Sequence, residues 1–306
     1  MKYHNLGNTN IKASRLALGL MRIADKSDEE AIEIIKTAFD VGINFFDHAD
    51  IYGAGLSEVK FAKAIKTLGV KREDYYLQSK VGIIPGKAYN FSYEHIMSSV
   101  EGILERLETN YLDSLLLHRP DMLMEPEVIA KAFKELRAQG KVLNFGVSNM
   151  NQFQVSYLQS LLPFKIEINQ LQYSIMHAGM STTSIFNNTN LYEKDFLSVG
   201  MMEYMRENNI TIQAWSPFQY GRYQGVFIDN DKFPELNEKL SELALKYGVT
   251  KNGIAVAWIN RHPAKIQTVV GTMTPSRLRE CAQGIDIELS HNDWYEIYLA
   301  AGNKIL

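Results

Sequence analysis

Residues 43–80, INFFDHADIYGAGLSEVKFAKAIKTLGVKREDYYLQSK, contain one complete unit of the pattern that decides the fold. Two short apolar runs, one ending at Asp47 and one at Lys80, enclose an amphipathic stretch at Ser57–Leu68. Short apolar runs are typical of buried strands, whereas apolar residues that recur every three or four positions are typical of a helix. A strand–helix–strand unit of this kind predicts that its two strands pair in parallel.

The same alternation continues along the chain. Eight β-like runs occur, at Leu16–Gly19, Ile43–Asp47, Tyr76–Lys80, Ser114–His118, Val142–Ser148, Ile166–Gln170, Ile210–Ser216 and Thr268–Gly271. Amphipathic stretches lie between them, at Ser27–Phe39, Ser57–Leu68, Ser92–Glu108, Glu127–Gln139, Gln152–Leu161, Ser198–Asn208 and Lys251–Ile259. Eight such units predict an α/β fold, the closed (β/α)₈ TIM barrel.

Two segments lie outside this repeat. Tyr3–Leu6 and Ile11–Ala13, separated by Gly7–Asn10, predict an N-terminal β-hairpin that plugs the bottom of the barrel. Ser290–Asn303 predicts an extra C-terminal helix. No Pro/Gly/Ser-rich linker interrupts the 306 residues, so we expect one domain, 1–306.

Composition argues against several classes of function. The 32 Lys and Arg against 35 Asp and Glu give a net charge of −3, which predicts no nucleic-acid partner and no binding to an anionic membrane. The single cysteine, Cys281, argues against an internal disulfide or a zinc site and favours a cytoplasmic location. The N-terminus has no signal-peptide pattern, and no run of about eighteen apolar residues predicts a membrane span.

Ionisable side chains end three consecutive predicted strands, at Asp47, Lys80 and His118, and Tyr52 follows the first. The carboxyl ends of barrel strands carry catalytic groups, so we expect these four residues to meet. A free tyrosine has a pKa of about 10, and a desolvated Lys80 ammonium would lower it. Asp47 would keep Lys80 charged, and His118 would hydrogen-bond to Tyr52 or to a substrate oxygen. The group predicts a general acid that serves a carbonyl oxygen.

Each of these residues taken alone also has a structural interpretation, as a turn residue, a surface charge or a buried histidine. Their joint placement at neighbouring strand ends favours catalysis. Two long connections, Tyr173–Asp195 and Phe218–Phe233, are interpreted as walls of a substrate pocket, with variable surface loops as the alternative. The rim residues Arg22, Arg222 and Tyr223 would either favour a negatively charged substrate or form surface salt bridges.

Several blocks in register resemble the aldo-keto reductase superfamily over essentially the full chain. They are Leu18–Arg22, Phe46–Gly53, Ser79-Lys80, Leu117–Asp121, Gly146–Asn149, Asn169-Gln170, Ala214–Pro217 and Gly271–Leu278. The resemblance implies a barrel enzyme that reduces small aldehydes or ketones with a nicotinamide cofactor and uses no metal. It places Asp47, Tyr52, Lys80 and His118 in the catalytic positions.

The resemblance also implies where the cofactor binds. Nicotinamide would be held by Ser148, Asn149, Gln170 and Trp215, whose hydroxyl, amides and flat ring suit a carboxamide on a pyridine ring. The other expected contacts come from the start of the chain, from the end of the seventh strand and from the last strand–helix turn: Gly19, Met21, Arg22, Ser216, Pro217, Phe218, Gly271, Thr272, Met273, Ser276, Arg277, Glu280 and Cys281. No GxGxxG is present, so binding in Rossmann fashion is not expected.

The last of these segments favours NADP. Arg277 matches the family position that grips the adenosine 2′-phosphate, and Thr272 and Ser276 add hydroxyls. The sequence departs from the family pattern at Gly271, where many members carry a lysine, and at Cys281, which replaces a frequent asparagine. NAD is therefore the alternative cofactor.

Two other functions remain open at this stage. The barrel could be an NADP(H)-binding sensor or regulatory subunit with little or no catalysis. It could also be a Schiff-base aldolase with Lys80 as the nucleophile, which the cofactor-binding blocks argue against.

Overall fold

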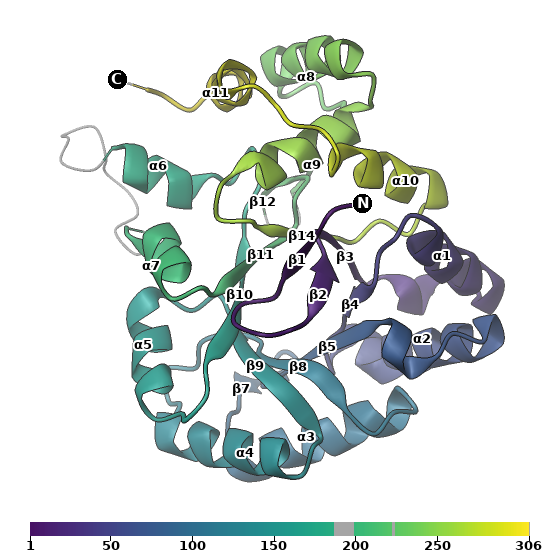
Figure 1. The fold of residues 1–306 in the computed structure, drawn as a ribbon, viewed down its shortest axis with the longest axis vertical. Helices are drawn as coiled ribbons and strands as arrows, with labels where there is room; N and C mark the ends of the chain where they lie inside the picture. The colour runs from purple at the N-terminus through teal and green to yellow at the C-terminus, as the bar shows by residue number, and fades with distance from the viewer. Residues whose placement is uncertain (187–198, 222–223, 306) are drawn as a thin grey trace.

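The computed structural model describes residues 1–186, 199–221 and 224–305. It contains a closed barrel of parallel strands whose order around the barrel follows the chain (Figure 1). The barrel strands are β3 (Leu16–Gly19), β4 (Phe45–Asp47), β5 (Tyr76–Val81), β8 (Leu112–Leu117), β9 (Val142–Ser148), β10 (Ile166–Gln172), β11 (Thr211–Trp215) and β14 (Gln267–Val270). The eight predicted strands and the predicted barrel are confirmed, with strand ends that agree to within two residues.

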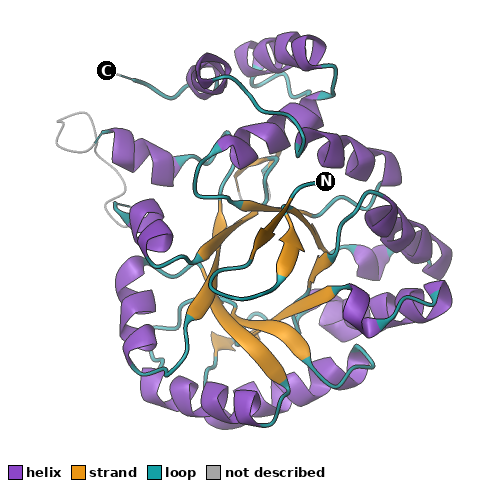
Figure 2. Cartoon of the chain, viewed as in Figure 1, coloured by secondary structure: helices purple, strands orange, loops and turns teal. Residues whose placement is uncertain are grey.

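Helices surround the barrel on its outside (Figure 2). Seven helices correspond to the predicted amphipathic stretches: α1 (Asp28–Asp40), α2 (Leu56–Leu68), α3 (Tyr93–Arg106), α4 (Pro126–Ala138), α5 (Gln152–Ser160), α7 (Met201–Glu207) and α9 (Lys251–Arg261). Ser198, the first residue of the predicted stretch Ser198–Asn208 that corresponds to α7, lies outside the described residues. The helix α10 (Pro275–Gly284) follows the last strand, and α11 (His291–Ala300) is the predicted C-terminal helix.

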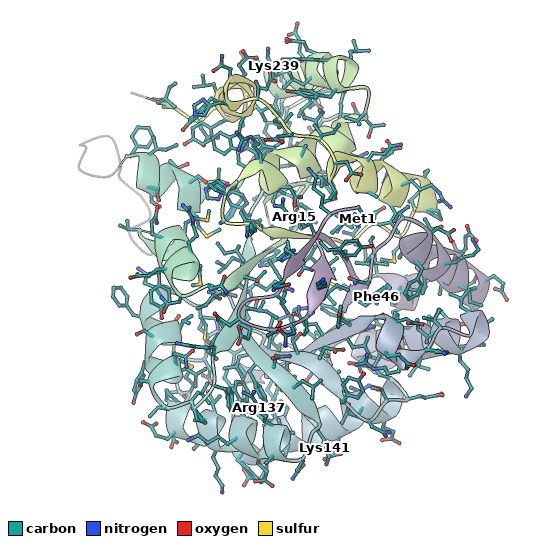
Figure 3. All side chains as sticks on the ribbon, viewed as in Figure 1. Met1, Arg15, Phe46, Arg137, Lys141 and Lys239 are labelled. Carbon is teal, nitrogen blue, oxygen red and sulfur yellow. The ribbon has the colours of Figure 1, made fainter. Side chains whose placement is uncertain are left out.

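The first helix shows why these stretches fold locally. Ser27 Oγ accepts a hydrogen bond from the Glu30 amide while the Glu30 carboxylate accepts one from the Ser27 amide, so two free N–H groups of the first turn are satisfied. Between helices and barrel, side chains fill the space (Figure 3). Phe46 of β4 lies there, with its ring centroid 5.2 Å from that of Phe39 and 5.0 Å from that of Phe61.

Several short elements are not predicted by the sequence pattern. The helix α8 (Pro234–Tyr247) buries only Leu236, Leu240 and Leu243, a sparse apolar face among many charged residues. Two antiparallel pairs, β6 (Ile83–Ile84) with β7 (Ala88–Tyr89) and β12 (Gln219–Gly221) with β13 (Gly225–Val226), are too short to give a period. The helix α6 (Gly179–Ile185) and three single 3₁₀ turns, η1 (Ile23–Asp25), η2 (Tyr52–Gly55) and η3 (Arg72–Asp74), complete the described elements.

The predicted plug is confirmed. Strands β1 (Tyr3–Asn5) and β2 (Lys12–Ser14) form an antiparallel hairpin that lies across one end of the barrel in Figure 1. Leu6, Ile11 and Ala13 of the hairpin segment share a buried cluster with barrel side chains, among them Phe45 and Ile168. The opposite end, where the strands finish, is therefore left for a site. Within the described part of the chain, no helix has the length and apolar character needed to cross a bilayer.

Candidate active site

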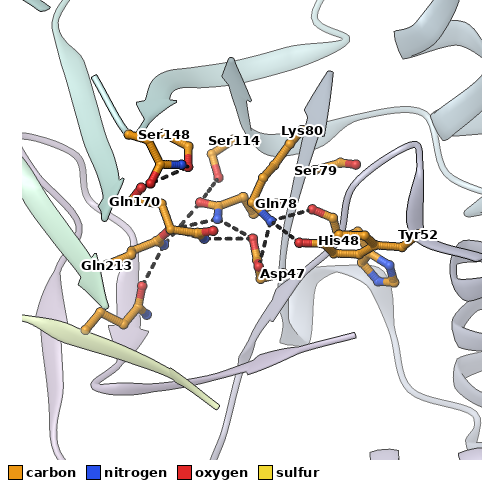
Figure 4. A network of polar contacts seen from close by, with 12 residues as sticks. Asp47, His48, Tyr52, Gln78, Ser79, Lys80, Ser114, Ser148, Gln170 and Gln213 are labelled. Carbon is orange, nitrogen blue, oxygen red and sulfur yellow. Dashed lines mark hydrogen bonds and ion pairs between the residues drawn. The ribbon is translucent and has the colours of Figure 1, made fainter. Parts of the chain in front are cut away.

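Three neighbouring barrel strands bring the four predicted catalytic residues to one end of the barrel. Asp47 is the last residue of β4, Lys80 lies next to the end of β5, and His118 directly follows β8. These strands are adjacent in the order β4-β5-β8, and Tyr52 begins the 3₁₀ turn after β4. Figure 4 shows Lys80 between Asp47 and Tyr52.

The Lys80 ammonium is fully buried and has three acceptors. Its Nζ lies 2.7 Å from Asp47 Oδ2, 2.9 Å from the backbone oxygen of His48 and 3.2 Å from Tyr52 Oη. An ammonium has three N–H donors and no acceptor, so all three are used. Tyr52 Oη accepts from Lys80, which leaves the phenol hydrogen free to be donated to another group.

The electrostatics of Tyr52 differ from the sequence prediction. Burial raises the pKa of Tyr52 above its ordinary value, and the nearby Lys80 charge offsets this only in part. The predicted net lowering is wrong because desolvation penalises the phenolate more than one cation favours it. Burial lowers the pKa of Lys80, but Asp47 and Tyr52 outweigh it and raise that pKa overall. Near neutral pH the site therefore holds a protonated phenol beside a charged ammonium.

His118 faces Tyr52 edge-on. The ring centroids are 5.9 Å apart with an interplanar angle of 81°, and no hydrogen bond joins the two among the described residues. Burial, reinforced by Lys80 and Arg119, holds the pKa of His118 well below its ordinary value, so the imidazole is neutral near pH 7. A neutral imidazole has one N–H donor, which is available to a substrate oxygen.

The four residues predicted to hold nicotinamide form one hydrogen-bonded group. Asn149 Nδ2 donates to Ser148 Oγ at 2.7 Å, Ser148 Oγ donates to the backbone oxygen of Gln170 at 2.8 Å, and Trp215 Nε1 donates to Asn149 Oδ1 at 3.1 Å. Asn149 and Ser216 have φ values of 58° and 52°, in the left-handed region that side chains rarely adopt. Strained backbone of this kind is concentrated at functional sites.

The predicted contacts near the start of the chain lie beside the last strand. A Cβ added to Gly19 would be 3.9 Å from Asp47 Oδ2, and one added to Gly271 would be 3.5 Å from Arg22 Nη2. The Arg22 guanidinium therefore covers the position where the resemblance would place a lysine. Met21 is 50% exposed at this rim.

The start of α10 carries the residues predicted to bind phosphate. Ser276 and Arg277 are exposed in its first turn, and no side chain caps this helix N-terminus. Arg277 forms no ion pair with any residue that the structure describes, whereas Arg279 Nη2 lies 3.8 Å from Asp40 Oδ2. A free cation and unpaired amides suit a phosphate group.

The remaining predicted cofactor contacts are in varied environments. Glu280 Oε2 accepts from Thr250 Oγ1 and Asn252 Nδ2 at 3.1 and 2.7 Å. Cys281 is only 1% exposed, and burial raises the pKa of its thiol to about 12. Partly exposed side chains are found at Phe218, Thr272 and Met273, whereas Pro217 is buried. The rim residues Arg222 and Tyr223 lie outside the described residues.

Polar residues that the sequence patterns did not single out also belong to this site. Gln78 and Gln213 are fully buried inside the barrel, and Gln78 Nε2 donates to Asp47 Oδ1 at 2.6 Å. Both interrupt apolar strand runs, which is the signal that could have identified them. Arg119, within the block Leu117–Asp121, has its Cζ 5.4 Å from the centroid of the Trp215 ring.

A separate cavity of about 370 Å³ lies between α6, α7, α9 and α11. Its lining includes Arg206, Arg261 and Trp294 together with Ser181, Ser184 and Ile185 of the long connection Tyr173–Asp195. None of the predicted catalytic or cofactor-binding residues contributes to it. The candidate active site is therefore defined by the side chains at the strand ends and not by this cavity.

Comparisons with known proteins agree with this geometry. The model of the Aldo/keto reductase family matches residues 15–299. An uncharacterized oxidoreductase, YcsN of Bacillus subtilis (strain 168), is 34% identical, over 95% of each chain. A 6-dehydroglucose reductase of Agrobacterium fabrum (strain C58 / ATCC 33970) is 30% identical, over 96% of this chain and 97% of the relative. The crystal structure of the thermostable aldo-keto reductase Tm1743 with the inhibitor epalrestat matches with a TM-score of 0.80 at 28% identity, covering 98% of this chain and all of that one. This oxidoreductase chain belongs to the aldo/keto reductase family.

Proposed function

We propose that this protein reduces an aldehyde or ketone to an alcohol with NADPH, and that Tyr52 donates the proton. The observation that supports this is the set of three acceptors around Lys80 Nζ, which leaves the phenol hydrogen of Tyr52 free. When bound, NADPH would supply the hydride.

The residues of the chain then supply the proton, stabilise the charge that forms and orient the substrate. Tyr52 gives its proton to the carbonyl oxygen, and the phenolate that forms stays beside the Lys80 ammonium, 3.2 Å away. That contact offsets the cost of placing a negative charge in a buried site, which is the cost that raises the pKa of Tyr52 beforehand. The neutral His118 imidazole donates to the same carbonyl oxygen and orients it. In alcohol oxidation the phenolate accepts the proton instead.

The side chains present fit a dinucleotide. Gln170 Oε1 has no hydrogen-bond donor among the described residues and suits the amide group of nicotinamide, with Ser148 and Asn149 beside it. Trp215 provides a flat ring against which the pyridine can stack. Arg277, exposed and without an ion pair in the described chain, suits a 2′-phosphate and favours NADP over NAD.

Replacement of Tyr52 by phenylalanine tests the chemistry. Tyr52→Phe is expected to lower kcat by roughly 10²- to 10⁴-fold because the proton donor is lost. The assay follows NADPH absorbance with a panel of carbonyl compounds that includes 4-nitrobenzaldehyde and 6-dehydroglucose, the latter because a relative is named as its reductase. Unchanged melting temperature and NADPH affinity would show that the variant is folded.

A variant as fast as its parent would rule out Tyr52 as the acid. A parent that binds NADPH but turns over none of these carbonyls would favour the sensor or regulatory role instead. Borohydride trapping of a substrate on Lys80 would favour the aldolase.

Replacement of Arg277 tests the choice of cofactor. Arg277→Ala is expected to weaken NADPH binding by roughly 10- to 100-fold and to leave NADH binding unchanged. The fold-change corresponds to the loss of about 1.5–3 kcal/mol, which is typical of a hydrogen bond to a charged group. The dissociation constants are measured by quenching of tryptophan fluorescence. Arg279→Ala, two residues along the same helix, is the matched control and should change neither. Tighter binding of NADH than of NADPH by the parent would overturn the choice of NADP.

A further inference from the structure

We propose that Gln213 is a positioning residue for the reaction. With Gln78, it fixes the carboxylate of Asp47 and turns the side chain of Gln170 so that its amide oxygen faces the nicotinamide position. This inference rests on the proposed function and adds to it residues that touch neither substrate nor cofactor.

The residues concerned form a continuous network inside the barrel (Figure 4). Gln78 Nε2 donates to Asp47 Oδ1 at 2.6 Å and to Gln213 Oε1 at 2.8 Å. Gln170 Nε2 makes the same two contacts, at 3.1 and 2.9 Å. Gln213 Nε2 donates to Gln78 Oε1 at 3.1 Å and to Gln267 Oε1 at 2.8 Å. The exposed fractions of Gln78, Gln170 and Gln213 are at most 3%, so water does not compete for these bonds.

The direction of every bond follows from Asp47. A carboxylate only accepts, so the NH₂ groups of Gln78 and Gln170 must point toward it. The second N–H of each amide donates to Gln213, which must therefore present its oxygen to them. The NH₂ of Gln213 is then left to donate to Gln78 Oε1 and Gln267 Oε1. The Gln267 amide continues the chain by donating to the backbone oxygen of Ser14 at 2.8 Å. Reversing any one of these amides would place donors against donors or acceptors against acceptors.

The orientation of Gln170 has a consequence for the cofactor. Both of its N–H bonds are used by Asp47 and Gln213, so only Oε1 remains available. No group among the described residues donates a hydrogen bond to this oxygen. The oxygen is also not fully buried, so it remains accessible from open space. It can accept a hydrogen bond from the amide of a nicotinamide ring but cannot donate one. Gln213 thus decides which of the two groups of Gln170 meets the cofactor.

The orientation of Asp47 has a consequence for Lys80. Two amide donors hold Oδ1, while Oδ2 accepts from Lys80 Nζ at 2.7 Å. Losing Gln213 would free both donors to rotate and would loosen the carboxylate that keeps the buried ammonium charged and in place. Small displacements of catalytic groups reduce rates strongly.

The test compares substitutions of two buried amide side chains, one inside the network and one outside it. Gln213→Leu removes all four contacts of that amide. Asn260 of α9 is buried, and its amide donates to the backbone oxygen of Val256 and to Thr268 Oγ1, so it lies outside the network. Asn260→Leu also buries leucine in place of an amide side chain and is the matched control for the loss of stability. Two dissociation constants are measured by tryptophan fluorescence, one for NADPH and one for 2′-phospho-ADP-ribose, which lacks the nicotinamide. The pH profile of kcat for 4-nitrobenzaldehyde reduction is also recorded.

For Gln213→Leu we expect weaker binding of NADPH with unchanged binding of 2′-phospho-ADP-ribose. We also expect kcat to fall by about 100-fold, with the alkaline limb of its pH profile moved to lower pH because Lys80 loses its charge more readily. Asn260→Leu should show neither change. Gln213→Glu keeps an oxygen for the amides of Gln78 and Gln170 and should bind NADPH more tightly than Gln213→Leu does, which keeps the question answerable if the leucine variant folds poorly.

The inference would be overturned if Gln213→Leu weakened the binding of both ligands equally. It would also be overturned if Gln213→Leu and Asn260→Leu gave the same kinetic profile. These outcomes differ from a failure of the proposed function. If the proposed function failed, the parent would lack carbonyl turnover. The ratio of the dissociation constants for NADPH and 2′-phospho-ADP-ribose would still report on the orientation of Gln170.

Discussion

Both oxygens of the Asp47 side chain are used by buried donors. Oδ2 accepts from Lys80, and Oδ1 accepts from Gln78 and Gln170. Lys80 is 0% exposed, so its charge depends on this partner and on the two other acceptors. One carboxylate therefore links the proposed proton donor, through Lys80, to Gln170, which would hold the cofactor.

Asp47→Asn is expected to disturb both sides at once. An asparagine has one acceptor oxygen, so its NH₂ must face either the Lys80 ammonium or the two glutamine amides, and donors then meet donors. Leaving the buried ammonium without its counter-charge should lower the free energy of unfolding by about 3–5 kcal/mol. Urea unfolding measures this, and the kcat of aldehyde reduction should fall in parallel. An asparagine variant as stable as its parent would show that Lys80 does not need the charge of Asp47.

At the scale of secondary-structure elements, an ion pair between α2 and α3 lies behind Lys80. Glu58 of α2 is fully buried and accepts from Arg106 Nε at 2.6 Å and from Ser79 Oγ at 3.2 Å. Ser79 directly precedes Lys80, so this contact ties the helix pair to β5. Burial raises the pKa of Glu58 from an ordinary 4.5 to about 7, despite Arg106, and raises that of neighbouring Asp50 to about 6.

This shift predicts a pH dependence of stability. The folded state holds the Glu58 proton more tightly than the unfolded chain does. The stabilisation of the folded state by this protonation is therefore complete below pH 4.5 and is lost as the pH rises through 7. Glu58→Gln cannot titrate. Its free energy of unfolding, relative to that of the parent, should therefore increase by about 3 kcal/mol between pH 4.5 and pH 8.

Asp50 titrates in both proteins, and its electrostatic effect on Glu58 is smaller than that of burial or of Arg106. Most of its contribution therefore cancels in the difference between the two proteins, which is measured by urea unfolding at the two pH values. A difference that moves the other way would mean that Arg106 keeps Glu58 ionised at both pH values.

At the scale of the whole molecule, the two ends of the barrel have different structures. The hairpin of β1 and β2 closes one end with apolar side chains, and the candidate active site occupies the other. The glutamine network joins them through Gln267, which donates to Ser14 of the hairpin. The plug therefore belongs to the core of the barrel.

Leu6→Ala separates stability from activity. Leu6 is 0% exposed in the cluster beneath the barrel, and its truncation should lower the free energy of unfolding by about 2–5 kcal/mol through lost burial and a cavity. The kcat of carbonyl reduction should not change at a temperature where the variant is folded. Lys12→Ala, exposed on the same hairpin, is the control and should be neutral. A fall in kcat for Leu6→Ala would show that the plug acts on the site.

The barrel could be predicted because its signals are local. The apolar runs that end at Asp47 and Lys80 and the capping box at Ser27 each lie within a few residues, and they gave the strands and the first helix nearly at their observed bounds. The helix α8 was not predicted, since three buried leucines among charged residues give a weak period. The short pairs β6–β7 and β12–β13 have too few residues for any period.

The sequence by itself determined the eight strands, the plug, and which ionisable residues stand at the strand ends, because strand period and position along a strand are properties of neighbouring residues. Only the tertiary structure decided that Gln78 and Gln213, 135 positions apart, share hydrogen bonds and together orient Asp47 and Gln170. It also decided the sign of the pKa shift of Tyr52, which is raised. Burial and the distance between remote side chains set both results, and neither quantity exists until the barrel has closed.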